Sequence, residues 1–435
     1  MSEETGESGR TAVAGDLMPA VVTSRDMRAR ATVLALCVAG YPLAAAMQAV
    51  TGVSSRLVTV PYRALVAGLS IWVLVRAWKA GWSGYGGMLW LPLGVFWLLY
   101  AWRLAMDGLF LPVGFGDPFS DYLLLGLGAS LLPMLACFTI VDADAAALGR
   151  TLTIAMATCG AVAAVILGFR DIALGNFLSV VTGRLGLEAL NPISLGHLGV
   201  TTSLLWLDRL LSPSGSRYRV PGIVAVLAGI AVAVISGSRG PILALIVCSA
   251  AMLLVARRRG RSVFGVVLVA VAVVTGVQGA RIAGDQLGLG VIRRVGGWGE
   301  DRSSLDRVTI LRDSWDQFLA HPLLGSGLQE KVSGSYPHNP ALEAFMATGV
   351  VGGATFFLLL VAGTFAALRL VRAAGDGAWI GILLLQYLIG AMLSGAVYAG
   401  TTLYPLLAAG VALASTLPPT TWAGFVLARP QEAGG

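Results

Sequence analysis

Charged residues are scarce in this chain: only 12% of its 435 residues are Asp, Glu, Lys or Arg, against roughly 25% in an average soluble domain. Hydrophobic residues make up 56%, and the mean hydropathy is +0.79. This composition excludes an ordinary soluble protein and indicates an integral membrane protein. The net charge of +7 is divided among many short loops without a continuous basic face, so we expect no nucleic-acid binding.

Cysteine is also rare. The four cysteines, Cys37, Cys137, Cys159 and Cys248, lie within apolar runs, with no C-x-x-C pair and no Cys/His cluster. We therefore expect small packing side chains, not disulfides or metal ligands, and we expect no metal or other cofactor. The sequence has no phosphate-binding P-loop either, so any energy for chemistry comes from the substrate.

Long apolar runs, by contrast, are abundant. They are about 16 to 25 residues long, enough for helices that cross a hydrocarbon core of about 30 Å, and they lack the alternation of barrel strands. The sequence therefore predicts an all-α polytopic membrane protein with about twelve transmembrane helices. The predicted spans are 31–52, 62–78, 86–105, 119–140, 151–168, 194–208, 220–237, 240–256, 262–279, 350–368, 377–395 and 403–421.

The distribution of arginine and lysine predicts the orientation. Most short loops that carry these residues fall on one side when both termini are cytoplasmic, as the positive-inside rule prefers. We expect no cleaved signal peptide. The predicted organisation is a disordered tail (1–30), nine helices (31–279), a long loop on the opposite face (280–349), three helices (350–421) and a cytoplasmic tail (422–435).

The loop 280–349 is the one long polar segment. Ser303 followed by Asp306 predicts a helix start, and apolar residues then recur on one face until Pro322 closes the pattern. We therefore expect an amphipathic helix over about 304–320. Its apolar face would either pack on the membrane domain or lie in the membrane interface, and the sequence leaves both open.

His338 lies at the end of this loop, in Tyr-Pro-His-Asn-Pro. Asn339 is suited to cap a following helix, and Pro340 suits its first turn. The N-terminal end of a helix disfavours a protonated imidazole and favours phosphate, so His338 is a candidate general base beside an anion site. The alternative is that His338 merely closes a re-entrant loop.

Arginines also occur on this face of the membrane, where positive charge is normally avoided. Arg239 lies in a short turn between two apolar spans, where a charge is costly unless it faces a polar cavity, and this favours an anionic ligand. Arg184 would bind the same ligand or pair with Glu188 one helical turn on. Local pairing with acidic residues of the loop is the better interpretation of Arg312.

Three motifs resemble the O-antigen ligase and O-antigen polymerase superfamily. His-Asn at 338–339, followed after nine residues by Gly-Val-Val-Gly at 349–352, is similar to its His-Asn-x9-Gly-x-x-Gly pattern. Ser-Gly-Ser-Arg-Gly at 236–240 opens a membrane helix, and Arg307 stands fifteen residues before Pro-Leu-Leu-Gly-Ser-Gly at 322–327. The resemblance covers the second half of the chain well and the first half by topology only.

The resemblance implies an O-antigen ligase of lipopolysaccharide biosynthesis in the bacterial inner membrane. Such a glycosyltransferase moves a glycan from undecaprenyl diphosphate to a sugar hydroxyl of lipid A-core on the periplasmic face. It implies that His338 takes the proton from that hydroxyl, with inversion at the anomeric carbon. The donor diphosphate would be bound by the arginines that correspond to those of the family, Arg184, Arg239 and Arg307. Supporting roles fall to Asn339, Glu343 and Gly349.

Two other functions remain open. An O-antigen polymerase shares the His-Asn motif and uses a second glycan as acceptor; the single long loop and about twelve spans favour the ligase. A twelve-helix transporter would carry charges at mid-membrane, in broken helices related between two halves. Here the polar residues gather in one external loop, and the halves show no similarity.

Overall fold

The computed structural model describes residues 23–81, 89–110, 119–173, 190–212, 217–255 and 302–418. Several predicted features lie outside these ranges: Arg184, Glu188, the span 262–279, the loop residues 280–301, and the C-terminal tail 422–435.

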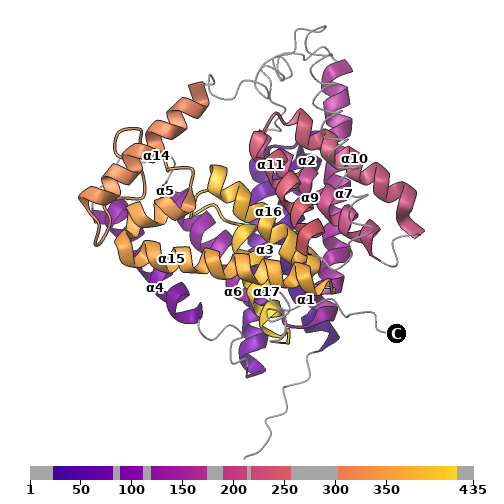
Figure 1. The fold of residues 1–435 in the computed structure, drawn as a ribbon, viewed down its shortest axis with the longest axis horizontal. Helices are drawn as coiled ribbons and strands as arrows, with labels where there is room; N and C mark the ends of the chain where they lie inside the picture. The colour runs from indigo at the N-terminus through magenta and orange to yellow at the C-terminus, as the bar shows by residue number, and fades with distance from the viewer. Residues whose placement is uncertain are drawn as a thin grey trace, which may run out of the picture.

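The described residues form a series of helices (Figure 1). Three of them, labelled η, are π-helical turns that continue neighbouring α-helices. The elements are α1 (Ser24–Ala35), η1 (Leu36–Gly40), α2 (Tyr41–Thr51), α3 (Ser55–Lys79), α4 (Trp90–Ala105), η3 (Met106–Phe110), α5 (Phe119–Asp121), η4 (Tyr122–Leu131), α6 (Leu132–Cys137), α7 (Ala143–Ala173), α9 (Pro192–Leu211), α10 (Arg219–Ile235), α11 (Arg239–Val255), α14 (Arg302–Ala320), α15 (Pro340–Ala373), α16 (Ala378–Ser394) and α17 (Leu403–Ser415).

Many of these helices are apolar enough to enter a membrane. In the described part of the chain, six are long and apolar enough to cross one by length and composition, and four shorter apolar helices accompany them. Each predicted span that falls in the described ranges coincides with a helix. The described part of the chain is therefore helical and consistent with a polytopic membrane protein. The count of twelve spans and the cytoplasmic termini stay predictions.

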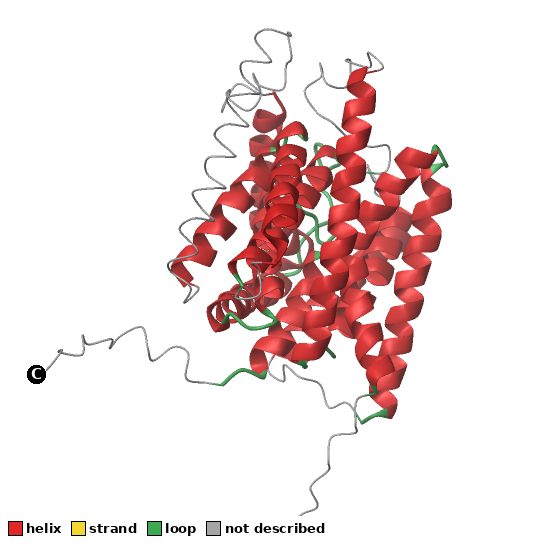
Figure 2. Ribbon diagram, turned by 90° about the vertical axis from the view of Figure 1, so that its right-hand side faces the viewer, coloured by secondary structure: helices red, strands yellow, loops and turns green. Residues whose placement is uncertain are grey.

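Several of the long helices run alongside one another and form a bundle (Figure 2). At one end, Arg76 of α3 pairs with Asp26 of α1 at 3.0 Å, and Arg150 of α7 pairs with Asp376 at 3.0 Å. Asp376 follows α15, whose 34 residues begin next to His338. The candidate base therefore lies at the end of the bundle opposite to these ion pairs.

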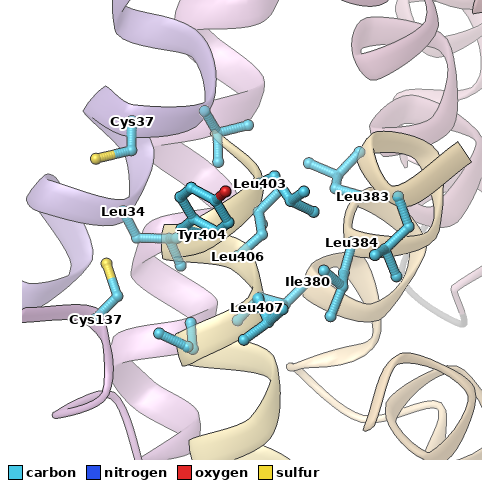
Figure 3. Packing of buried hydrophobic residues seen from close by; sticks show 14 of the residues in the cluster. Leu34, Cys37, Cys137, Ile380, Leu383, Leu384, Leu403, Tyr404, Leu406 and Leu407 are labelled. Atoms are coloured by element: carbon cyan, nitrogen blue, oxygen red, sulfur yellow. The ribbon is translucent and has the colours of Figure 1, made fainter. Parts of the chain in front are cut away.

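The core of the bundle surrounds α17, which is almost wholly buried. Figure 3 shows its side chains between those of η1 and α1 on one side and those of α16 on the other. The residues in contact there include Leu34, Cys37, Ile380, Leu383, Leu384, Leu403, Tyr404, Leu406 and Leu407.

The cysteines match the predicted packing role in three of four cases. Cys37, Cys137 and Cys248 are buried, and all four cysteines are free thiols. Cys159 of α7 is exposed, so this side chain does not have the predicted packing role. Cys159 lies in an apolar helix with one face turned away from the bundle. The hydropathy of the sequence does not show which apolar residues lie on that face and which lie in the core.

The helix α15 is broken at Gly349, which has φ 70° and ψ −167°. Residues 340–348 therefore form a short helix of their own before the span continues from Val350. A helix end leaves amides and carbonyls without partners inside the helix, and in apolar surroundings each of them costs free energy unless another group bonds it.

The loop 322–328, called the closing loop below, supplies part of those bonds. The amide of Val350 donates to the carbonyl of Pro322 at 2.7 Å, and the amide of Ser326 donates to the carbonyl of Met346 at 3.0 Å. The closing loop thus bonds both sides of the break in α15.

Arg103 of α4 bonds further carbonyls at the break in α15. Its Nε donates to the carbonyl of Ala347 at 2.8 Å, and one terminal nitrogen donates to the carbonyls of Leu324 at 2.8 Å and Gly325 at 2.9 Å. The other terminal nitrogen lies 3.3 Å from the carboxylate of Asp107. Because a guanidinium presents five donors in a fixed plane, one side chain meets carbonyls from both the closing loop and the short helix.

Two further side chains anchor the loop. The second carboxylate oxygen of Asp107 accepts from the amide of Leu328 at 2.8 Å. Gln317 of α14 donates to the carbonyl of Gln329 at 3.2 Å and accepts from the amide of Lys331 at 3.0 Å. The chain between α14 and α15 is therefore held on both α4 and α14.

Replacing Gly349 by alanine should destabilise the protein by at least about 2 kcal/mol, since the conformation is essentially restricted to glycine and a Cβ would overlap the carbonyl of Leu323. Thermal unfolding of the purified protein in detergent measures this. The matched control is Gly68→Ala in α3, where no heavy atom lies within 4 Å of the added Cβ and alanine favours the helix. Equal unfolding temperatures for the two variants would contradict the account of the break.

Candidate active site

His338 immediately precedes the cap of α15. The side-chain oxygen of Asn339 accepts from the amides of Ala341 and Leu342, both at 3.1 Å, and Pro340 occupies the first turn, as the sequence predicts. His338 itself has φ 58°, a left-handed conformation that non-glycine residues adopt rarely. This backbone conformation and the cap next to it determine where the partly exposed imidazole points.

A row of aromatic rings borders the imidazole. The ring of Tyr336 lies 4.4 Å from that of His338, at an angle of 60°. Tyr336 also contacts Tyr398 at 5.9 Å, and Tyr398 lies 4.2 Å from Tyr122 of η4. Such tilted and edge contacts favour defined ring orientations. The position of His338 is therefore coupled to the segment 395–402 and to η4.

Glu343 organises the segment between α16 and α17. This carboxylate is fully buried; one oxygen accepts from the hydroxyl of Tyr100 at 3.3 Å, and the other accepts from the amide of Val397 at 2.8 Å. The hydroxyl of Tyr404 donates to the carbonyl of Val397 at 2.8 Å. Both backbone groups of Val397 are thus bonded, and Glu343 acts by fixing the backbone next to Tyr398.

Arg239 lies at the same end of the bundle as the candidate base. The side-chain nitrogen of Asn339 donates to the carbonyl of Met392 in the last turn of α16, at 3.1 Å. A Cβ on Gly240 would come within 3.5 Å of Leu393 in that same turn. Both the His-Asn motif and the half-buried Arg239, the first residue of α11, therefore lie against the end of α16.

Arg307 and Arg312 occupy different faces of α14. Arg307 precedes Ser314 by seven residues and Phe318 by eleven, which places the three on one helical face. Ser314 and Phe318 are buried, and Phe318 packs on Phe345 at 5.3 Å. Arg312 is exposed. Arg307 thus lies on the inward face, about 16 Å along the helix from the contact of Phe318 with Phe345.

The other two histidines do not belong to the His-Asn motif. His197 is buried in α9, with its Nδ1 3.3 Å from the side-chain nitrogen of Gln386 and its ring stacked on Tyr387. His321 is exposed after the last residue of α14. Within the described ranges, no three His, Cys, Asp or Glu side chains come together as a metal site would require. A metal-independent reaction stays a prediction.

Arg103 and Asp107 are structural partners of the site that the sequence reasoning missed. A signal was present, because the two residues are spaced i, i+4 within an otherwise apolar run. Charges inside a membrane span are costly and pair with each other or with backbone carbonyls, so such a pair marks a functional or structural site.

Glu330 shapes the turn that leads to the His-Asn motif. Its side chain is almost fully buried and accepts from the amides of Val332 and Ser333, both at 2.6 Å, while its own amide donates to the carbonyl of Ser335 at 2.9 Å. Burial alone would raise the pKa of Glu330, but the hydrogen bonds from Val332 and Ser333 outweigh it and hold the pKa below its usual 4.5.

Because the folded state lowers the pKa of Glu330, its carboxylate stabilises the fold above pH 4.5, and this stabilisation is lost as the pH falls through the folded-state pKa. Glu330→Gln should therefore unfold at a lower temperature than the unmodified protein at neutral pH, since bonds to a charged group contribute about 1.5–3 kcal/mol each. The gap between the two unfolding temperatures should narrow below pH 4.5. A gap that stays constant into the acid range would show that the charge does not hold the turn.

The family model described as O-Antigen ligase matches residues 223–357. The matched segment contains α11, α14, the closing loop and the break in α15, and with them Arg239, Arg307 and His338. A search of curated proteins gives no match to the chain. Residues 223–357 of this chain are therefore similar to the O-antigen ligase family.

Proposed function

We propose that the protein is an O-antigen ligase. It transfers the O-antigen glycan from undecaprenyl diphosphate to a sugar hydroxyl of lipid A-core on the periplasmic face of the bacterial inner membrane. The observation that carries this proposal is the placement of His338, in a left-handed conformation beside the cap of a short helix and at the same end of the bundle as Arg239, within the segment that matches the family.

His338 is the proposed general base. A neutral imidazole accepts the proton of the acceptor hydroxyl while the hydroxyl oxygen bonds to the anomeric carbon of the glycan. The bond from that carbon to the diphosphate oxygen breaks at the same time, and undecaprenyl diphosphate leaves with the electron pair. Because the acceptor attacks opposite the leaving group, the anomeric configuration inverts.

Arg239 is the proposed ligand of the donor diphosphate. A guanidinium is permanently charged and bonds two phosphate oxygens through parallel N–H groups, so it stabilises the negative charge that builds on the leaving group. Arg239 is also the first residue of α11, where the positive end of the helix dipole adds to the attraction. Arg307 and Arg184 are proposed as further ligands of the same diphosphate.

Purified undecaprenyl-diphosphate-linked O-antigen and lipid A-core, mixed with the protein in detergent, test the proposed reaction. A ladder of glycan-bearing lipid A-core on a gel is the product expected of a ligase. Lengthened glycan that remains on undecaprenyl diphosphate, with lipid A-core unchanged, would identify a polymerase instead. Flux of the donor across proteoliposome membranes without a new glycosidic bond would identify a transporter.

His338→Ala should lower the transfer rate by about 10²–10⁴, the usual contribution of a general base, while affinity for the donor changes little because the base acts in the transition state. The matched control is His321→Gln, an exposed histidine outside the His-Asn motif, which should keep full activity. A well-folded His338→Ala protein that still forms the full ladder would refute the assignment of the base.

Arg239→Lys should lower transfer markedly although the charge is kept, since an ammonium does not reproduce the planar pair of N–H groups. Arg312→Lys is the matched control: the arginine is exposed on α14 and should tolerate the change. Initial rates at several donor concentrations measure both variants. If the two variants lose activity to the same extent, Arg239 has no special role at the diphosphate.

A further inference from the structure

The helix α14 has an apolar stripe that is exposed among the described residues. Val308, Trp315 and Leu319 recur at spacings of seven and four residues, so they share one face, and their exposed fractions are 64%, 48% and 55%. Phe318 lies beside this stripe and turns inward onto Phe345 at 5.3 Å. The apolar residues of α14 are therefore divided between an inner contact and an outer stripe.

The outer stripe continues into the closing loop. Leu323 and Leu324 follow the end of α14 directly, and their exposed fractions are 72% and 57%. A run of large apolar side chains on the surface indicates contact with an apolar partner, because exposure of each such side chain to water costs free energy.

The backbone of this part of the loop is suited to apolar surroundings. The carbonyl of Pro322 accepts from Val350, the carbonyl of Leu324 accepts from Arg103, and the amide of Gly325 donates to the carbonyl of His321 at 3.0 Å. Irregular backbone is tolerated at membrane depth only where its polar groups are bonded in this way.

The exposed leucines also adjoin the outward faces of candidate membrane helices. Val350 and Val351 begin the part of α15 that follows the break, and their exposed fractions are 43% and 53%. The amide of Val350 donates to the carbonyl of Pro322, next to Leu323. Leu109 and Phe110, each 69% exposed, follow Asp107 at the end of the span that begins with α4. Figure 1 shows α14 beside the start of α15, at one side of the bundle.

We propose that Val308, Trp315, Leu319, Leu323 and Leu324 form a lipid-contact surface that lies against the acyl chains of the leaflet on the His338 side. The partner is the bilayer because this surface is continuous with side chains that face outward from membrane-spanning helices. Exposed Arg312 and Asp316 border the stripe on α14, as expected for a helix at the boundary between lipid and water. This placement deepens the proposed function, since a site bordered by lipid receives lipid-linked substrates by lateral diffusion.

Spin labels at single cysteines test the proposal without an activity assay. The background is Cys159→Ser, because the other three cysteines are buried. Labels at Leu319→Cys and Leu324→Cys are compared in phospholipid vesicles with a label at Val351→Cys, on a candidate span, and one at Asp306→Cys, an exposed position away from the stripe. Accessibility to oxygen, which concentrates in lipid, is measured against accessibility to a water-soluble nickel chelate.

Labels at positions 319 and 324 should be more accessible to oxygen than to the nickel chelate, like the label at position 351. The label at position 306 should be more accessible to the nickel chelate, as expected for a side chain in water. Nickel preference at both 319 and 324, in protein that keeps its unfolding temperature, would overturn the lipid-contact surface. Dipolar broadening between labels on two molecules would also overturn it, because the partner would then be a second copy of the chain. Loss of glycan transfer with the oxygen preference intact would count against the proposed function alone.

Discussion

A helix that stops in apolar surroundings has to find partners for its open amides and carbonyls, and the rest of this structure depends on how that requirement is met at Gly349. The conformation of Gly349 ends one helix and starts another within α15. The carbonyls and amides at the break are bonded by the closing loop and by Arg103, whose own charge is matched by Asp107. One buried guanidinium thereby joins α4, the closing loop and the short helix 340–348.

The same bonds position the candidate site. The chain that closes the break runs on through the turn of Glu330 to His338, so the closing loop and the short helix hold the His-Asn motif from both sides. Glu343 fixes the segment that carries Tyr398, and Tyr398 contacts the ring next to the imidazole. A proton acceptor in glycosyl transfer has to be placed accurately, because a misplacement of about 1 Å costs roughly 10² in rate. The hydrogen bonds and ring contacts at this end of the bundle are consistent with that demand.

Part of the candidate site could be predicted from the sequence, because it depends on residues that are neighbours in the chain. The cap at Asn339, Pro340 in the first turn and the amphipathic helix α14 depend on nearest neighbours and helical periodicity, and the structure has all three. The bonds of Arg103 and Glu343 join residues more than 50 positions apart, and no periodicity reports such pairs. The sequence predicts the boundary between the loop and the next span at Gly349, but it does not show the break in the helix there, which depends on the closing loop that lies beside it.

Hydrogen exchange of the closing loop in Arg103→Lys tests the central claim, that Arg103 holds the break in α15 and through it the site. Peptides that cover 322–328 and 346–350 should exchange faster in this variant, and transfer should fall by about 10², the cost of a misplaced catalytic group. Arg369→Lys is the matched control, because Arg369 also donates to two carbonyls, at 2.7 and 3.0 Å, but at the opposite end of α15. Unchanged exchange of both peptides in Arg103→Lys would contradict the claim.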